Sequence, residues 1–150
     1  SLQNQIASSG LTSVTLKGWS DDLKSIFADA DLFCSPSLDE PFGLVIGEAM
    51  AMGLPVIASD TDGASELFGI NTGSADAALQ HGGMIIPAGD TAALAAAIGR
   101  FCADEKLRQT TGRNARKRIE TSFTHTHMAD RLDRLIRSVT PSPGAERSYI

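Results

Sequence analysis

Short apolar segments alternate with longer stretches of helical periodicity, and this alternation restricts the fold more than any other feature of the sequence. Three of these segments, Leu32–Cys34, Pro55–Ala58 and Gly82–Ile86, are apolar at consecutive positions. Strands of this kind are covered on both faces, which is typical of parallel sheets between two layers of helices. The sequence therefore predicts an α/β fold with a Rossmann-like parallel sheet and helices on both faces.

Further elements are expected around these three strands. A fourth strand is predicted at Val14–Leu16, a β-branched run that Gly18 closes. Ser20 is the expected N-cap of the helix that follows. Apolar residues at helical spacing predict helices over about 23–30, 44–52, 64–68, 91–101, 104–121 and 125–139. The long connection 69–82 is typical of a surface insertion or of a functional loop.

Length and charge limit the domain number and the classes of partner. A chain of 150 residues can bury one core, so we expect a single domain over 1–140 and a mobile tail over 141–150. Thirteen basic and 18 acidic residues give a net charge of −5. Without a basic stripe, a nucleic-acid-binding surface is not expected. The sequence shows no signal peptide and no apolar run of membrane-spanning length, so we expect a cytoplasmic protein.

The cysteines and histidines do not form a metal-binding pattern. Cys34 and Cys102 lie in apolar stretches and are expected to be small buried hydrophobes, since two thiols make neither a disulfide framework nor a zinc site. His81, His125 and His127 have no neighbouring cysteine or carboxylate at ligand spacing. No metal is therefore expected, and His125 and His127 should face solvent at the start of a helix.

The segment 35–48, Ser-Pro-Ser-Leu-Asp-Glu-Pro-Phe-Gly-Leu-Val-Ile-Gly-Glu, is the most informative part of the chain. It connects a predicted strand to a predicted helix at the carboxyl edge of the sheet, where open α/β sheets bind ligands. The helix that begins near Gly43 offers unpaired N–H groups and a positive dipole end, which suit a phosphate. Because Gly43 has no side chain, a diphosphate could approach the backbone closely.

Two carboxylates flank this helix start. Glu48 is four residues after Leu44 and so lies on the same helix face, with its side chain leaning back toward the N-terminus. A carboxylate in that place can accept hydrogen bonds from a vicinal diol such as a ribose. Spacing alone leaves a second interpretation open, in which Glu40 is a solvated loop acid and Glu48 a surface acid favoured by the helix dipole.

The Glu40-x7-Glu48 arrangement resembles the donor-site signature of group 1 glycosyltransferases, which are retaining enzymes of the two-domain GT-B fold. The resemblance covers about residues 11 to 136. It includes Val14-x-Leu-x-Gly18, Ala30-Asp31, Pro36-Ser37, Glu40-Pro41-Phe42-Gly43, Glu48-Ala49-Met50, Gly53-Leu54-Pro55-Val56, Ser59-Asp60, Glu66 and Ile85-Ile86-Pro87. The sequence is thus identified as part of the C-terminal, donor-binding domain of such an enzyme.

The resemblance implies a role for each matching residue of the 40–48 segment. Glu40 contacts hydroxyls of the donor sugar and is the catalytic residue beside the reacting centre. Phe42, Gly43 and Leu44 line the sugar and the diphosphate, largely through backbone groups. Glu48 binds the ribose hydroxyls.

Three more positions are assigned in the same way. Gly18, Trp19 and Ser20 match the loop that packs against the base, and Trp19 either stacks on the base or packs at the rim. At Asp62-Gly63 the relatives commonly carry two glycines, so the Asp is a departure. Glu66 is expected to cap or orient a short helix.

For the protein as a whole, the resemblance implies transfer of a hexosyl unit, with retention, from a nucleoside diphosphate sugar to a carbohydrate or lipid-linked acceptor. No cofactor or metal is implied. The family's cationic diphosphate clamp and its acceptor-binding N-terminal domain match no segment here, so we expect an N-terminally truncated domain that is inactive alone. Contact with a membrane would come through the missing domain, and two copies of the chain could associate through Val14–Leu16.

A nicotinamide-dependent dehydrogenase is disfavoured because no G-x-G-x-x-G follows a predicted strand. A non-catalytic nucleotide-binding or oligomerising α/β domain stays open, because an unpaired sheet edge invites association.

Overall fold

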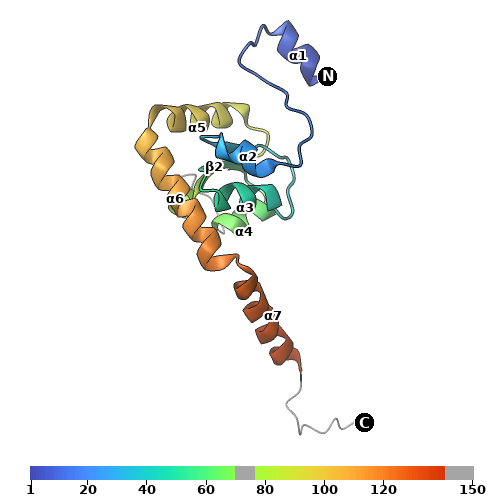
Figure 1. Cartoon of the computed structure of the whole chain (residues 1–150), viewed down its shortest axis with the longest axis vertical. Coiled ribbons are helices and arrows are strands. Elements are labelled where there is room, and N and C mark those ends of the chain that lie inside the picture. Colours follow the sequence, from blue (N-terminus) through green and yellow to red (C-terminus); the bar gives the residue numbers. More distant parts are fainter. Residues whose placement is uncertain (70–76, 141–150) are drawn as a thin grey trace.

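The computed structural model describes residues 1–69 and 77–140 and shows a parallel three-stranded sheet between layers of helices (Figure 1). The strands are β1 (Phe33–Ser35), β2 (Val56–Ser59) and β3 (Gly83–Ile86), and β2 lies between the other two. The helices are α1 (Leu2–Ser8), α2 (Leu23–Ala28), α3 (Leu44–Ala51), α4 (Asp62–Phe68), α5 (Thr91–Ala103), α6 (Glu105–Ser122) and α7 (His125–Val139), with a 3-10 helix η1 (Ala77–His81). The expected α/β class is confirmed.

The central strand explains why the predicted strands are apolar at consecutive positions. All four side chains of β2 are buried, and neighbouring side chains point to opposite faces. Val56 and Ala58 join a core with α3, α4 and α6, in which Phe68 is fully buried. Ile57 joins a second core with α5, in which Phe101 is fully buried. The sheet is therefore covered on both faces, as a parallel sheet requires.

Side-chain caps set the starts of several helices. Asp90 Oδ1 accepts from the Ala93 N–H at 2.9 Å at the start of α5, and Asp104 Oδ1 accepts from the Leu107 N–H at 2.8 Å at the start of α6. α2 is capped by Asp22 rather than by Ser20, which corrects the sequence-based expectation. The Ser20 hydroxyl instead accepts a hydrogen bond from the N–H of Asp22, the N-cap residue, at 3.1 Å.

The fourth strand expected at Val14–Leu16 is not formed. No helix or strand is assigned over residues 11–22, and Val14 and Leu16 are exposed. This segment leads from α1 to α2 outside the sheet (Figure 1). Within the described ranges no strand lies beside it, and a strand needs a neighbour to receive its backbone hydrogen bonds. The expectation is therefore wrong for this structure, because local propensity does not supply a pairing partner.

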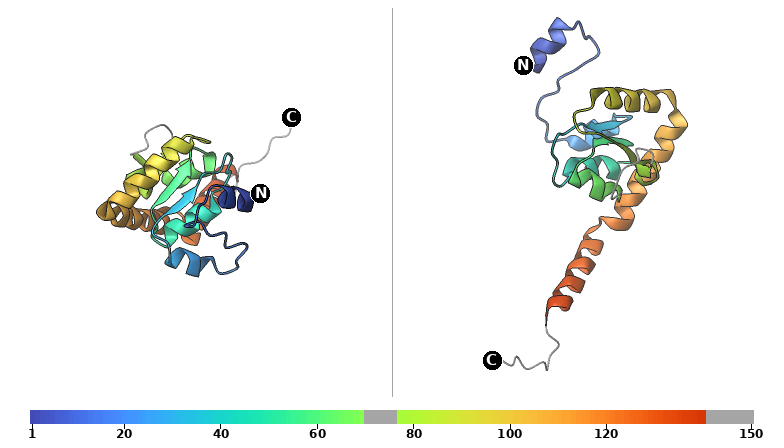
Figure 2. Two further views of the ribbon diagram at one scale, coloured as in Figure 1. Left: turned by 90° about the horizontal axis from the view of Figure 1, so that it is seen from above. Right: turned by 180° about the vertical axis from the view of Figure 1, so that it is seen from behind.

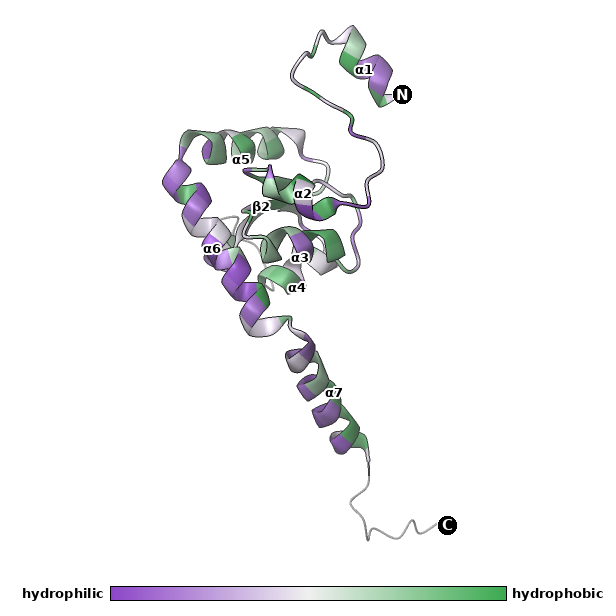
Figure 3. Ribbon diagram, viewed as in Figure 1, coloured by the Kyte–Doolittle hydropathy of each residue, from purple (hydrophilic) through white to green (hydrophobic). Residues whose placement is uncertain are grey.

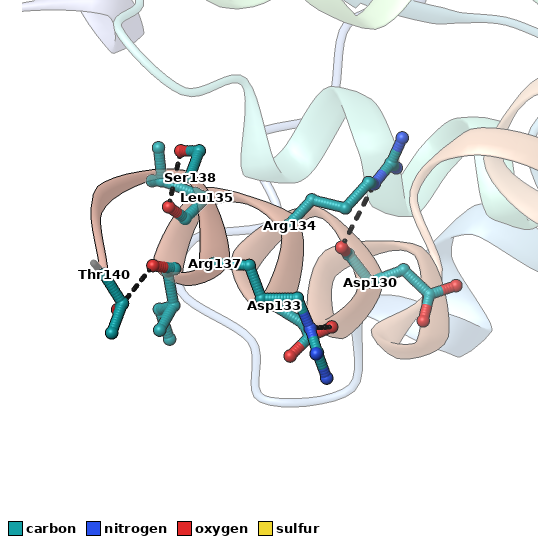
Figure 4. A network of polar contacts seen from close by, with 8 residues as sticks. Asp130, Asp133, Arg134, Leu135, Arg137, Ser138 and Thr140 are labelled. Carbon is teal, nitrogen blue, oxygen red and sulfur yellow. Dashed lines mark hydrogen bonds and ion pairs between the residues drawn. The ribbon is translucent and has the colours of Figure 1, made fainter. Parts of the chain in front are cut away.

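Helix α7 extends away from the rest of the molecule, at the end opposite α1 (Figures 1 and 2). Every residue from Met128 to Thr140 is exposed. Its polar contacts are local, as in the ion pair at 2.7 Å between Arg137 Nε and Asp133 Oδ2 (Figure 4). Figure 3 shows apolar residues gathered along one side of this helix. That apolar side remains exposed, although Met128, Leu132 and Leu135 line a cavity together with Glu66 and Phe123.

Two findings bear on the wider expectations. None of the helices in the described residues is long and apolar enough to cross a membrane. The predicted tail 141–150 and half of the connection 69–82, residues 70–76, lie outside the described residues. The part of that connection that the structure does describe contains η1, which was not predicted.

Candidate functional site

The turn between β1 and α3 places a glycine at the start of the helix. Gly43 is the N-cap of α3 and has φ +65° and ψ +33°, a left-handed conformation that favours glycine. The N–H of Gly43 donates to Glu40 Oε1 at 3.0 Å, and the N–H of Phe42 donates to the same oxygen at 3.4 Å. Glu40 is half-buried. Its carboxylate therefore lies at the N-terminal end of α3 and is not a free loop acid.

The first turn of α4 holds this turn in place. The Gly63 N–H donates to the Glu40 carbonyl at 2.9 Å. A Cβ at position 63 would lie 2.7 Å from the Glu40 carbonyl oxygen and 2.8 Å from the Gly43 nitrogen. Glycine is thus required at 63, whereas Asp62 is exposed and leaves this contact intact. The sequence showed the glycine, but the need for it is set by a residue 23 positions away along the chain (63 − 40).

A groove runs beside the turn and along the outer face of α3. Its volume is about 680 Å³, which is in the range of small-molecule sites, about 300–1,000 Å³. It is lined by Phe42, Gly43, Leu44, Gly47, Glu48, Ala51, Gly63, Glu66, Leu67, Ile119, Phe123 and His125. Leu44 and Glu48 line it together, in agreement with their predicted position on one face of the helix. Glu48 is exposed and free to meet a ligand in the groove.

Several residues that line the groove were not predicted for this site, and three of them, Glu66, Phe123 and His125, carry polar or aromatic side chains. Glu66 lies within α4 and lines the groove, while the N-cap of α4 is Thr61. Phe123 and His125 come from the junction of α6 and α7. His125 is exposed as expected, but it faces the groove. Only tertiary packing brings these segments to α3, so the sequence did not place them at this site, although Glu66 is part of the family resemblance.

The predicted base-binding residues are not brought to the groove. Trp19 is 87% exposed and lies in the irregular segment before α2. Gly18 has φ +72°, and Ser20 is held by its bond with Asp22. None of the three lines the groove that contains Glu48. Their role in binding a base stays a prediction.

The thiols and imidazoles are placed as follows. Burial raises the pKa of the half-buried Cys34 thiol, and the nearby Cys102 raises it further. Cys102 itself is exposed, which corrects the expectation of burial, because Phe101 takes the core-facing position on that turn of α5. His127 is partly buried and its Nδ1 lies 2.7 Å from Thr124 Oγ1, so it does not simply face solvent. The described residues contain no group of three His, Cys, Asp or Glu side chains suited to a metal.

Comparison with known sequences decides the family. Residues 1–118 match the family described as Glycosyl transferases group 1. The chain belongs to this family. It is 35% identical over 123 residues to YtcC of Bacillus subtilis (strain 168), which covers 79% of this chain and 28% of YtcC. It is 33% identical over 121 residues to the capsular polysaccharide biosynthesis glycosyltransferase CapM of Staphylococcus aureus, covering 80% and 29%.

Solved structures place the sheet of this group 1 glycosyltransferase chain in a known fold. HepE of Anabaena, in complex with UDP, has a TM-score of 0.78 at 28% identity, covering 92% of this chain and 36% of that one. Sucrose-phosphate synthase from Thermosynechococcus elongatus has a TM-score of 0.75 at 34% identity, covering 91% and 33%. These are GT-B glycosyltransferases, so the expected GT-B, Rossmann-like fold is confirmed. The chain spans about a third of the length of these relatives.

Proposed function

We propose that this chain holds the nucleoside diphosphate sugar donor of a retaining hexosyltransferase. The observation that carries the proposal is that one groove is lined both by the N-terminal end of α3, with its left-handed Gly43 cap, and by the Glu48 side chain. HepE, a structural neighbour, was solved in complex with UDP and with UDP-glucose. A nucleoside diphosphate sugar offers a diphosphate and a ribose diol, which suit a helix N-terminus and a carboxylate respectively.

Each residue of the 40–48 segment has a role in this proposal. The N–H groups of Phe42, Gly43 and Leu44 contact the diphosphate and the sugar. Glu48 accepts hydrogen bonds from the ribose hydroxyls. Glu40 contacts the sugar near the anomeric carbon, and the helix start stabilises the departing diphosphate as its charge develops. Gly18, Trp19 and Ser20 are proposed to reach the base.

The proposal extends to the reaction in which the donor is used. The acceptor is a carbohydrate or a lipid-linked molecule, and neither a cofactor nor a metal is assigned. Because the chain spans about a third of the relatives' length, we propose that it does not catalyse transfer alone. A cytoplasmic location, with membrane contact through other parts of the protein, stays a prediction. Hydrolysis by two carboxylates about 5 Å apart across the sugar is disfavoured, since Glu40 and Glu48 are assigned to different parts of one donor.

Calorimetric titration of the purified chain with UDP and, separately, with GDP tests the proposal. We expect one of the two nucleotides to bind at a single site and the corresponding nucleotide sugar to compete with it. Failure of both to bind at millimolar concentration would contradict the proposal.

A second candidate function is self-association through α7. Met128, Leu132, Leu135 and Val139 recur at spacings of four, three and four residues, which puts them along one side of the helix, and all four are exposed. Two copies could bury these sides against each other, as an oligomerising domain would.

Light scattering on the wild-type chain and on a Leu132→Asp, Leu135→Asp variant separates this candidate from a monomeric donor domain. Association predicts a dimer or larger species that the double substitution dissociates. Arg134→Asp, on the polar side of the same helix, is the matched control and should leave the mass unchanged. A monomeric wild-type chain would reject self-association and leave the donor site unaffected.

A further inference from the structure

The backbone groups assigned to the donor are already hydrogen-bonded within the chain. The N–H groups of Gly43 and Phe42 both donate to Glu40 Oε1, at 3.0 and 3.4 Å. These are two of the groups proposed to contact the diphosphate and the sugar. A phosphate oxygen and the Glu40 carboxylate therefore compete for the same donors, and both carry negative charge.

Only the side chain of Glu40 has to move for a ligand to enter. The backbone of the turn is fixed, because the Glu40 carbonyl accepts from the Gly63 N–H at 2.9 Å and a Cβ at 63 would have no room. The adjoining Phe42 side chain is exposed, so the turn borders open space. Displacing the carboxylate breaks charge-assisted hydrogen bonds, which are the stronger kind.

We propose that Glu40 makes the site favour the sugar-bearing donor over the free nucleoside diphosphate. This inference rests on the proposed function. When the sugar is present, its hydroxyls donate to the displaced carboxylate and replace the lost amide bonds. The free nucleoside diphosphate has no sugar, so the displaced carboxylate gains no partner and stays close to a second anion. After transfer, the return of Glu40 to the Gly43 N–H favours departure of the diphosphate product.

Titration of wild-type, Glu40→Gln and Glu40→Ala chains with UDP and UDP-glucose tests this selectivity. Removal of the competing carboxylate should tighten UDP binding about three- to tenfold in Glu40→Ala, given the usual strength of hydrogen bonds to charged groups in partly exposed sites. Glu40→Gln, which keeps a weaker acceptor, should show a smaller gain. UDP-glucose binding should weaken or stay unchanged. The same pair of titrations with GDP and GDP-mannose covers the case of a guanine base.

Two controls separate this inference from the proposed function and from misfolding. Glu48→Ala should weaken the binding of UDP and of UDP-glucose to a similar degree, since both ligands carry the ribose. Amide NMR signals of Phe42 and Gly43 should shift in Glu40→Gln while those of buried β2 stay in place, which shows a local change in a folded chain.

Equal or weaker UDP binding in the Glu40 variants, alongside the expected loss in Glu48→Ala, would overturn the selectivity role alone. Absence of binding by either nucleotide to the wild type and to every variant would overturn the donor site, and this inference with it.

Discussion

The N–H of Gly63 donates to the carbonyl of Glu40 at 2.9 Å, and this bond joins the start of α4 to the turn that precedes α3. The two residues follow neighbouring strands, β1 and β2, at the same edge of the sheet. The loop that carries Glu40 and Gly43 is therefore positioned by the next βα unit as well as by its own strand and helix.

The first prediction concerns Gly63→Ala. The added Cβ would lie 2.7 Å from the Glu40 carbonyl oxygen, so the turn must shift. Overpacking of this kind costs about 1–3 kcal/mol, which urea denaturation would detect, and nucleotide binding should weaken as the turn moves. Gly99→Ala in α5 is the control, since a Cβ there meets nothing within 4 Å and alanine stabilises a helix by about 0.5–1 kcal/mol. Equal stability of Gly63→Ala and wild type would contradict the close approach.

The second prediction concerns the attachment of α4 to α6. Arg118 Nε donates to the Leu67 carbonyl at 2.9 Å, and its guanidinium lies 5.2 Å from the ring centre of Phe123. Arg118→Ala should lower the free energy of unfolding by about 1–3 kcal/mol, because a charge-assisted hydrogen bond to the carbonyl of buried Leu67 and a cation–π contact are lost.

Arg116→Ala is the matched control on the same helix. Its ion pair with Glu120 is 2.8 Å long but lies in solvent, with the arginine side chain 63% exposed, so its loss should cost less than about 0.5 kcal/mol. Equal effects of the two substitutions would mean that Arg118 does not hold α4.

The third prediction concerns the two cysteines. The pKa of Cys34 is raised above its ordinary value of 9.0, so at neutral pH it is a half-buried neutral thiol, while Cys102 is exposed. The thiolate is the reactive form. Maleimide at pH 7.5 should therefore label Cys102 well before Cys34, as mass spectrometry of peptides would show. Labelling of both at the same rate would contradict the burial of Cys34.

The same shift gives a pH dependence of stability. The pKa of the Cys34 thiol is higher in the folded chain than in the unfolded chain. The contribution of this thiol to the free energy of unfolding is therefore fully present at pH values below the unfolded pKa. It is lost as pH rises from the unfolded pKa through the folded pKa. Stability should thus fall above about pH 8.5–9, and this part of the fall should be absent in Cys34→Ala.

The three strands of the sheet could be predicted because consecutive apolar residues indicate a strand that is covered on both faces. Val14–Leu16 has similar local residues but forms no strand, since pairing depends on a neighbour and not on the segment itself. The paired position of Leu44 and Glu48 followed from helix geometry alone. The contributions of Gly63 and His125 could not be predicted, because each depends on where a distant segment packs.

The central claim is that the groove at the start of α3 binds a nucleoside diphosphate through Glu48 and the helix N-terminus. Calorimetric titration of the wild type and of Glu48→Ala with the nucleotide that binds tests it most directly. Loss of a charged hydrogen bond to the ribose is worth about 1.5–3 kcal/mol, so the dissociation constant should rise about tenfold or more. A Glu48→Ala chain that remains folded and binds the nucleotide with wild-type affinity would contradict the account.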